Sequence, residues 1–119
     1  MIEIRKTEVF AQWLDDLRDI QARARVQVRI ERLTTGNPGD VEPLGEGVSE
    51  LRINYGPGYR VYFTHQGQDI VILLAGGDKS SQSKDIQTAL MLAIVSPATA
   101  FIKSLRIFLD KSRSGADFS

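Results

Sequence analysis

The chain has 119 residues, enough for one domain with a single hydrophobic core. Its 15 basic residues balance its 15 acidic residues, so binding to a polyanion would need a local basic patch. The absence of cysteine and the presence of one histidine exclude disulfides, thiolate metal sites and a zinc site built from histidines alone. We expect neither a metal nor an organic cofactor.

The N-terminus and the longest uncharged segment indicate a protein without a membrane anchor. Residues 1–10 contain two glutamates and lack the apolar stretch of a signal peptide. The uncharged run 86–102 is interrupted by Pro97 and is shorter than the roughly 20 apolar residues that a membrane span needs. We therefore expect a cytoplasmic protein.

The first third of the chain predicts a short strand and two helices. Residues 2–5 alternate between apolar and charged side chains, as a strand does. Residues 7–35 contain no Gly or Pro, and Asp19 is a candidate N-cap for a second helix after a brief break. Residues 26–30 also alternate, but the length of the segment and the absence of breakers favour a helix. Apolar side chains recur at spacings of three and four and predict one buried face: Phe10, Trp13, Leu14, Leu17, Ile20, Ala24 and Val28.

Four arginines form a basic stripe along the second predicted helix. They are Arg18, Arg25, Arg29 and Arg32, at spacings of seven, four and three. A solvated helix face is the ordinary explanation of such a stripe. The alternative is an RNA-contacting face, with Arg29 and Arg32 as binding residues.

The middle of the chain predicts a three-strand meander. Residues 36–40 end the helical part, and a loop or edge segment follows over residues 41–47. Residues 50–55 form the first strand, and Gly56-Pro57-Gly58 predicts a type II turn with Pro57 and Gly58 at its centre. Residues 59–65 form the second strand. Residues 69–75 are apolar without alternation, which is typical of a strand covered on both faces.

A helix is predicted after the third strand. Asp78, Ser80 and Ser81 are its candidate caps, and Pro97 ends it. Residues 1–95 are expected to form the domain. Residues 96–119 are expected to be a C-terminal extension with one amphipathic helix and a frayed end. Because helices and strands are segregated along the chain, the fold class is predicted to be α+β.

The candidate chemistry of this chain is basic. Alternation places Arg52 and Arg60 on the same side of adjacent strands, with Lys79 just past the third strand and Lys84 on the helix that follows. Guanidinium groups match phosphate oxygens in geometry, and such cations favour a transition state that carries more negative charge than the substrate. Arginines that only solvate the sheet are an equal alternative.

Three stretches carry a resemblance to a known family. They are GNPGDVEPLGEGVSELR, SELRINYGPGYRVYF and DIVILLAGGDKSSQSKDIQTAL, within residues 36–90. They closely resemble the HigB-like addiction-module killer proteins of the RelE/ParE toxin superfamily, over residues 1 to about 92. The resemblance implies a small α+β domain: two N-terminal helices packed on a small curved antiparallel sheet, here the meander plus the N-terminal strand, followed by a C-terminal helix.

The resemblance also implies a function. The chain would be a toxin that a cognate helix-turn-helix antitoxin protein neutralises. Many relatives are endonucleases that cut mRNA on the ribosome, without a metal, through attack of the ribose 2′-OH. Arg60 and Lys79 match phosphate-contacting positions, and Arg52 corresponds approximately to another. We expect Tyr62 to stack on a base and Lys84 to contact RNA.

Two departures from the family pattern leave alternatives open. The segment SSQSKDIQTAL lacks the tyrosine or histidine that several relatives use for proton transfer, which leaves ribosomal RNA or one of four side chains: Lys79, Lys84, Asp85 or Tyr62. The C-terminal part beyond about residue 91 also differs from the family. The alternatives are a ParE-like inhibitor of DNA gyrase and an inactive relative that only binds antitoxin.

Overall fold

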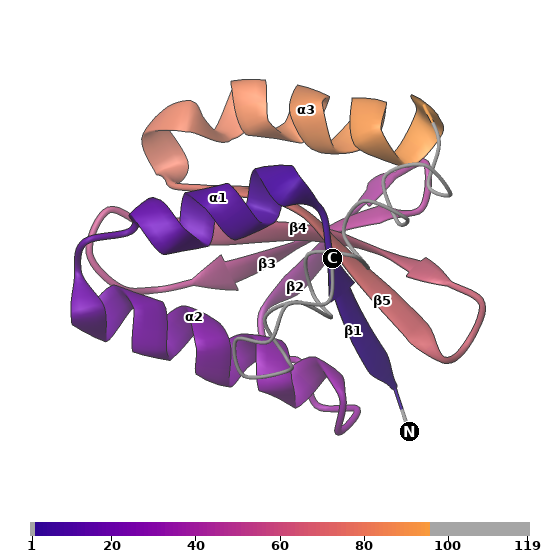
Figure 1. Ribbon diagram of the computed structural model, residues 1–119, viewed down its shortest axis with the longest axis horizontal. Coiled ribbons are helices and arrows are strands. Elements are labelled where there is room, and N and C mark those ends of the chain that lie inside the picture. Colours follow the sequence, from indigo (N-terminus) through magenta and orange to yellow (C-terminus); the bar gives the residue numbers. More distant parts are fainter. Residues whose placement is uncertain (1, 96–119) are drawn as a thin grey trace, which may run out of the picture.

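The computed structural model describes residues 2–95, which form a sheet with helices on both faces (Figure 1). The elements in order are β1 (Glu3–Lys6), α1 (Glu8–Asp16), α2 (Ile20–Leu33), β2 (Val41–Gly45), β3 (Val48–Ile53), β4 (Tyr59–Gln66), β5 (Ile70–Gly77), a 3-10 turn (Lys79–Ser81) and α3 (Gln82–Val95). The predicted α+β class is confirmed. The extension predicted for residues 96–119 lies outside the described residues.

The sheet has five strands in the order β1-β5-β4-β3-β2. Strands β2 to β5 form an antiparallel meander, whereas β1 pairs in parallel with β5, so the sheet is mixed rather than antiparallel throughout. The segment predicted as a loop or edge is the edge strand β2. An edge tolerates Pro43, which has no backbone N–H to donate, and the pairing shifts register between Pro43 and Gly45.

Side-chain caps set the start of both N-terminal helices. The Thr7 hydroxyl accepts a hydrogen bond from the Phe10 N–H at the start of α1 and donates one to the Leu74 carbonyl at 2.7 Å. Asp19 accepts hydrogen bonds from the backbone N–H groups of Gln21 and Ala22, which confirms it as the N-cap of α2.

The predicted apolar face of α2 is wrong. Ile20 is 79% exposed and Val28 is 54% exposed. The helix instead buries Ala22, Val26 and Leu33. The two residues between α1 and α2 that flank Arg18 have extended backbone, so the periodicity of the first helix does not continue into the second.

The sheet separates two hydrophobic cores. On one face, α1 and α2 pack against side chains of β3, β4 and β5, among them Leu51, Val61 and Leu73. On the other face α3 covers Tyr62 and Leu74. Strand β5 is buried along nearly its whole length, which confirms the prediction that it is covered on both sides. Within residues 2–95, no helix combines the length and the apolar character that crossing a membrane requires.

Two adjacent glycines let helices approach the end of β5 from opposite faces. A Cβ atom at Gly76 would lie 2.2 Å from the Trp13 ring of α1. A Cβ atom at Gly77 would lie 1.8 Å from the Asp85 carboxylate of α3. Larger residues at these positions would push the helices away from the sheet, so the Gly-Gly pair places the start of α3 beside the strand ends.

The turn between β3 and β4 is shifted by one residue from its prediction. The Gly58 N–H donates to the Tyr55 carbonyl, so Gly56 and Pro57 are the two central residues. Gly56 has a φ of 57°, a left-handed conformation that favours glycine. Gly58 also has a positive φ, 81°, as its prediction required, so both glycines that flank Pro57 adopt a conformation that favours glycine.

Candidate functional site

The candidate site lies on the α3 face of the sheet, where two arginines are direct neighbours. Arg52 of β3 pairs with Arg60 of β4 in the antiparallel register. Leu51 and Val61, the residues next to them, point into the opposite core. The structure therefore confirms that both arginines lie on the same side of adjacent strands.

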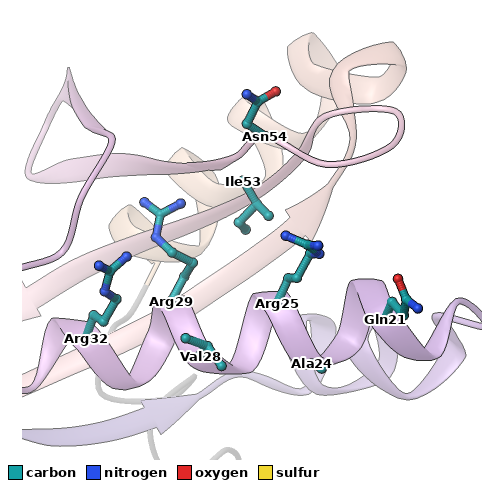
Figure 2. Close-up of a pocket in the computed structure, with 8 residues that line it drawn as sticks. All are labelled: Gln21, Ala24, Arg25, Val28, Arg29, Arg32, Ile53 and Asn54. Atoms are coloured by element: carbon teal, nitrogen blue, oxygen red, sulfur yellow. The ribbon is translucent and has the colours of Figure 1, made fainter.

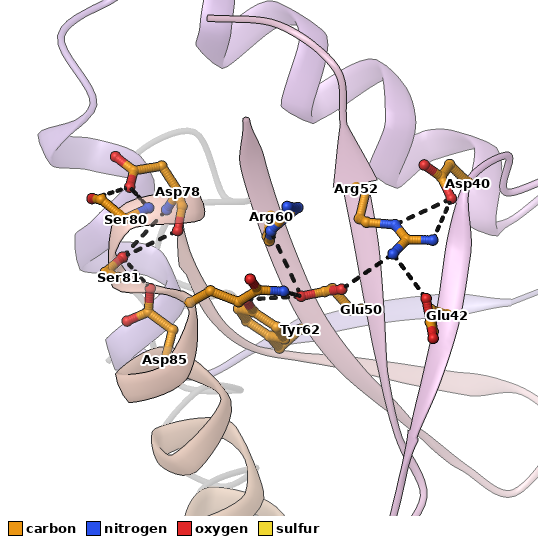
Figure 3. Close-up of polar contacts among 11 residues, drawn as sticks. Asp40, Glu42, Glu50, Arg52, Arg60, Tyr62, Asp78, Ser80, Ser81 and Asp85 are labelled. Atoms are coloured by element: carbon orange, nitrogen blue, oxygen red, sulfur yellow. Dashed lines mark hydrogen bonds and ion pairs between the residues drawn. The ribbon is translucent and has the colours of Figure 1, made fainter. Parts of the chain in front are cut away.

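A buried carboxylate lies between these two cations. Glu50 of β3 is 1% exposed, with its carboxylate 3.9 Å from the Arg52 Nη1 atom and 3.8 Å from the Arg60 Nε atom. It also accepts a hydrogen bond from the Tyr62 hydroxyl at 3.2 Å (Figure 3). The Gln82 amide donates another at 2.8 Å. A buried charge is tolerated only with such partners.

Sequence reasoning missed Glu50. The signal was present in the alternation of the Ser-Glu-Leu-Arg stretch, because Glu50 shares a strand face with Arg52. The burial of that face depends on α3, and periodicity within the strand does not place a later helix over it.

Carboxylates already occupy the Arg52 guanidinium. Its Nε and Nη2 atoms donate to Asp40 at 3.3 and 3.0 Å, and its Nη1 atom donates to Glu42 at 2.8 Å. The hydrogen bond to Asp40 raises the pKa of Arg52 above its ordinary value. An incoming phosphate would have to compete with these acids, so Arg52 contributes mainly to holding β2 and the segment before it on β3.

Arg60 is placed differently. Its side chain is 12% exposed, and its buried Nε atom faces Glu50 without a hydrogen bond. Figure 3 shows the two terminal nitrogens directed away from Glu50. Within residues 2–95 these nitrogens have no hydrogen-bond partner. Arg60 therefore presents a held guanidinium with free donors.

Tyr62 does not match its predicted role. Its ring is fully buried under α3, so no RNA base can stack on it in this conformation. Burial, together with the neighbouring Glu50 carboxylate, raises the pKa of Tyr62 far above its ordinary value of 10.0. The predicted stacking requires this face of β4 to be exposed, whereas α3 covers it.

The two lysines predicted for the site are exposed near its rim. The Lys79 N–H donates to the Pro57 carbonyl at 3.4 Å, and the Lys79 Cβ atom would lie 3.6 Å from a Cβ atom at Gly58. The β3–β4 turn and the 3-10 turn thus touch each other and place Lys79 at the same end of the strands as Arg60. Lys84 is exposed in the first turn of α3.

Two acidic side chains organise the start of α3. Asp78 accepts hydrogen bonds from Ser80, which lower the pKa of the Asp78 carboxyl. Asp85 accepts a hydrogen bond from the Ser81 hydroxyl and lies over Gly77, the residue that pairs with Arg60. Within residues 2–95, no three His, Asp or Glu side chains are grouped as ligands for a metal ion.

The structure does not bring Arg29 and Arg32 together with Arg60. Both lie on α2, which packs on the opposite face of the sheet. Arg29 donates to the backbone carbonyls of Arg52 at 2.6 Å and Pro38 at 3.0 Å, and so holds the loop before β2. Arg32 is exposed.

Comparison with known proteins places the chain in a family. Residues 12–93 match the phage-derived Gp49-like proteins (DUF891). The chain belongs to this Gp49-like family. The family is RelE-like and associated with toxin–antitoxin systems. A Haemophilus influenzae protein named only as uncharacterized is 49% identical over 92 residues, which cover 77% of this chain and 93% of that protein.

The segment that matches the Gp49-like family contains the whole candidate site. It includes the buried carboxylate Glu50, both paired arginines and both exposed lysines. It also includes the Gly-Gly pair that sets the position of α3. The site is therefore part of the family domain rather than of the C-terminal residues beyond it.

Proposed function

We propose that this Gp49-like protein is the toxin of a type II toxin–antitoxin module and cleaves mRNA on the ribosome. Its partners are then a cognate helix-turn-helix antitoxin and ribosome-bound mRNA. The observation that supports this most is the state of Arg60. Glu50 holds the guanidinium on one side, while its terminal nitrogens are free within residues 2–95.

A guanidinium held in this way suits a phosphate ligand. Its two terminal nitrogens match two phosphate oxygens in a bidentate contact. Its largely buried position strengthens the interaction, because less water screens the charge. The buried carboxylate of Glu50 limits the conformational freedom of the Arg60 side chain. Binding of RNA therefore costs little further side-chain entropy.

The reaction in this proposal is transfer of the phosphoryl group within the RNA. The ribose 2′-oxygen forms a bond to the adjacent phosphorus, the bond from phosphorus to the 5′-oxygen breaks, and a cyclic phosphate remains. Negative charge on the phosphorane oxygens increases in the transition state, and Arg60 stabilises it. Lys79 and Lys84 attract the flanking phosphates from the rim.

Asp85 is the proton acceptor in this proposal. Its carboxylate lies over Gly77, opposite Arg60 in the sheet, and it is only partly buried. Tyr62 does not fit the role, because it is fully buried and its pKa is raised. The 5′-oxygen that leaves takes a proton from Lys79 or from solvent.

Replacing Arg60 tests the proposal. Arg60→Ala should reduce cleavage at least 100-fold, on the order expected when a group that stabilises transition-state charge is removed. The measurement is primer extension on an mRNA translated in a bacterial extract. Arg18→Ala, which changes an exposed arginine between α1 and α2, is the matched control and should cleave like the wild type. Circular dichroism checks that both variants are folded.

The other outcomes point to other functions. Cleavage that survives in folded Arg60→Ala contradicts the role of Arg60. Absence of cleavage by the wild type, with inhibition of DNA supercoiling by gyrase, supports a ParE-like toxin. Absence of both activities, with antitoxin binding retained, supports an inactive relative.

A further inference from the structure

A second basic feature lies on the α2 side of the molecule, away from Arg60. It is a groove with a volume of about 530 Å³, formed between α2 and the end of β3. Figure 2 shows that the arginines of α2 rise along one side of it, while Ile53 and Asn54 border the other. The groove is large enough for one or two side chains of a partner.

The floor of this groove is apolar. Ala24, Val28 and Ile53 line it. Val28 is 54% exposed, so its side chain is accessible to a partner. Burying Val28 under an apolar side chain of a partner would remove this surface from water and favour association.

The rim of the groove is positively charged and partly rigid. Arg25, Arg29 and Arg32 line it, and none of its lining residues is acidic. The Arg25 guanidinium lies 4.6 Å from the centre of the Tyr55 ring, a cation–π contact. Backbone carbonyls hold Arg29. Two of the three cations are therefore positioned before any ligand binds, which lowers the entropy cost of binding.

We propose that this groove binds a short acidic segment of a partner protein. An aliphatic side chain of that segment packs on Val28 and Ile53, and its carboxylates contact Arg25 and Arg32. The carboxylates of such a segment complement the positive rim, and its aliphatic side chain complements the apolar floor.

RNA fits the groove less well. Proteins that bind single-stranded RNA commonly stack its bases on aromatic rings. Among the described residues no aromatic side chain lines this groove, and Arg25 already packs on the nearby Tyr55 ring. Phosphates would use the arginines but would leave the apolar floor unoccupied. The groove therefore favours a peptide with both kinds of side chain.

The groove and the Arg60 site lie on opposite faces of the sheet. Ile53 belongs to the core under α1 and α2, whereas Arg60 is one residue away from Val61 of that core and points to the α3 face. A partner segment in the groove would leave Arg60 uncovered. The proposal thus concerns a separate site and does not depend on RNA cleavage.

A binding measurement with three variants tests the proposal. The probe is a fluorescein-labelled amphipathic peptide of Glu and Leu residues, and its binding to the full chain is followed by fluorescence anisotropy. Arg32→Glu reverses a rim charge and Val28→Asp places a charge in the floor; each should weaken binding roughly tenfold or more. Arg18→Glu makes the same charge change outside the groove and should weaken binding less than about twofold.

Arg18, Val28 and Arg32 are exposed, so the three variants should fold, which circular dichroism verifies. A peptide in which Lys replaces Glu should not bind. The proposal is overturned if the acidic peptide does not bind, or if Arg18→Glu weakens binding as much as Arg32→Glu. It is also overturned if a single-stranded RNA oligonucleotide binds more tightly than the peptide and loses affinity in Arg32→Glu. None of these results depends on whether Arg60→Ala abolishes cleavage.

Discussion

Glu50 is the residue on which the arrangement of the candidate site depends. It touches two arginines, a tyrosine and a glutamine that come from β3, β4 and α3. With Arg52 held by Asp40 and Glu42, Arg60 is the arginine of this pair whose terminal nitrogens have no partner within residues 2–95. Two arginines that look equivalent in the sequence are therefore different in the structure.

The pH dependence of stability tests the environment of Tyr62. Its phenol stays neutral in the fold above the ordinary pKa of 10.0, because burial beside Glu50 raises its pKa. In the unfolded chain the phenol ionises near pH 10, so the unfolded state binds fewer protons there and is favoured as pH rises. The contribution of Tyr62 to the free energy of unfolding is thus fully present below about pH 10 and decreases progressively as the pH rises above it.

We expect Tyr62→Phe to lose stability less steeply than the wild type between about pH 9 and pH 11. The difference in slope can reach about 1.4 kcal/mol per pH unit for one proton. Urea unfolding at each pH measures it. The pKa values of Tyr55 and Tyr59 are also raised, but both tyrosines are present in both proteins and cancel in the comparison. Parallel curves for the two proteins would contradict a buried, neutral Tyr62.

At the scale of elements, the end of β5 decides how close the helices lie to the sheet. Gly76 admits the Trp13 ring of α1 on one face, and Gly77 admits the Asp85 carboxylate of α3 on the other. The sequence predicted a third strand over residues 69–75, which ends before this Gly-Gly pair. The structure shows that β5 continues through Gly77 and that the absence of side chains serves helix packing.

Gly76→Ala should destabilise the fold by about 1–3 kcal/mol, since the added methyl group overlaps the Trp13 ring. Trp13→Ala removes the ring, so Gly76→Ala should cost much less in that background. Urea unfolding of the four proteins gives the coupling energy. Circular dichroism is the suitable signal, because Trp13 is the sole tryptophan of the chain. Equal costs in both backgrounds would show that the ring does not set the requirement for glycine.

At the scale of the whole molecule, two basic clusters lie on opposite faces of a chain whose charges otherwise balance. The chain has no net charge at neutral pH. The arginine groove on α2 and the cluster around Arg60 lie on opposite faces of the sheet. In our two proposals, each cluster binds an anionic ligand without covering the other.

This arrangement predicts a shallow salt dependence for RNA binding. Three cations, Arg60, Lys79 and Lys84, face the RNA in our proposal. For single strands, the slope of log affinity against log salt is then about −2. Anisotropy titrations of a short single-stranded RNA between about 50 and 200 mM salt measure the slope. A slope steeper than about −5 would instead indicate a wide basic surface that includes α2.

The sequence was enough to predict those features of secondary structure that depend only on residues close together in the chain. The Asp19 cap, the two helices, the hairpin around Pro57 and the buried third strand are all confirmed. The shared face of Arg52 and Arg60 is also confirmed, because alternation along a strand needs no distant contact.

Long-range packing decided the rest. The parallel pairing of β1 with β5 depends on contacts between distant segments, and so does the choice of which face of α2 is buried. The burial of Tyr62 and Glu50 requires α3 to cross their strands, and the occupation of Arg52 requires β2 at its side. By itself the sequence determined which residues could carry charge on which strand face. Only tertiary structure decided which of those charges are already neutralised and which are free, because desolvation and ion pairing depend on what packs above each side chain.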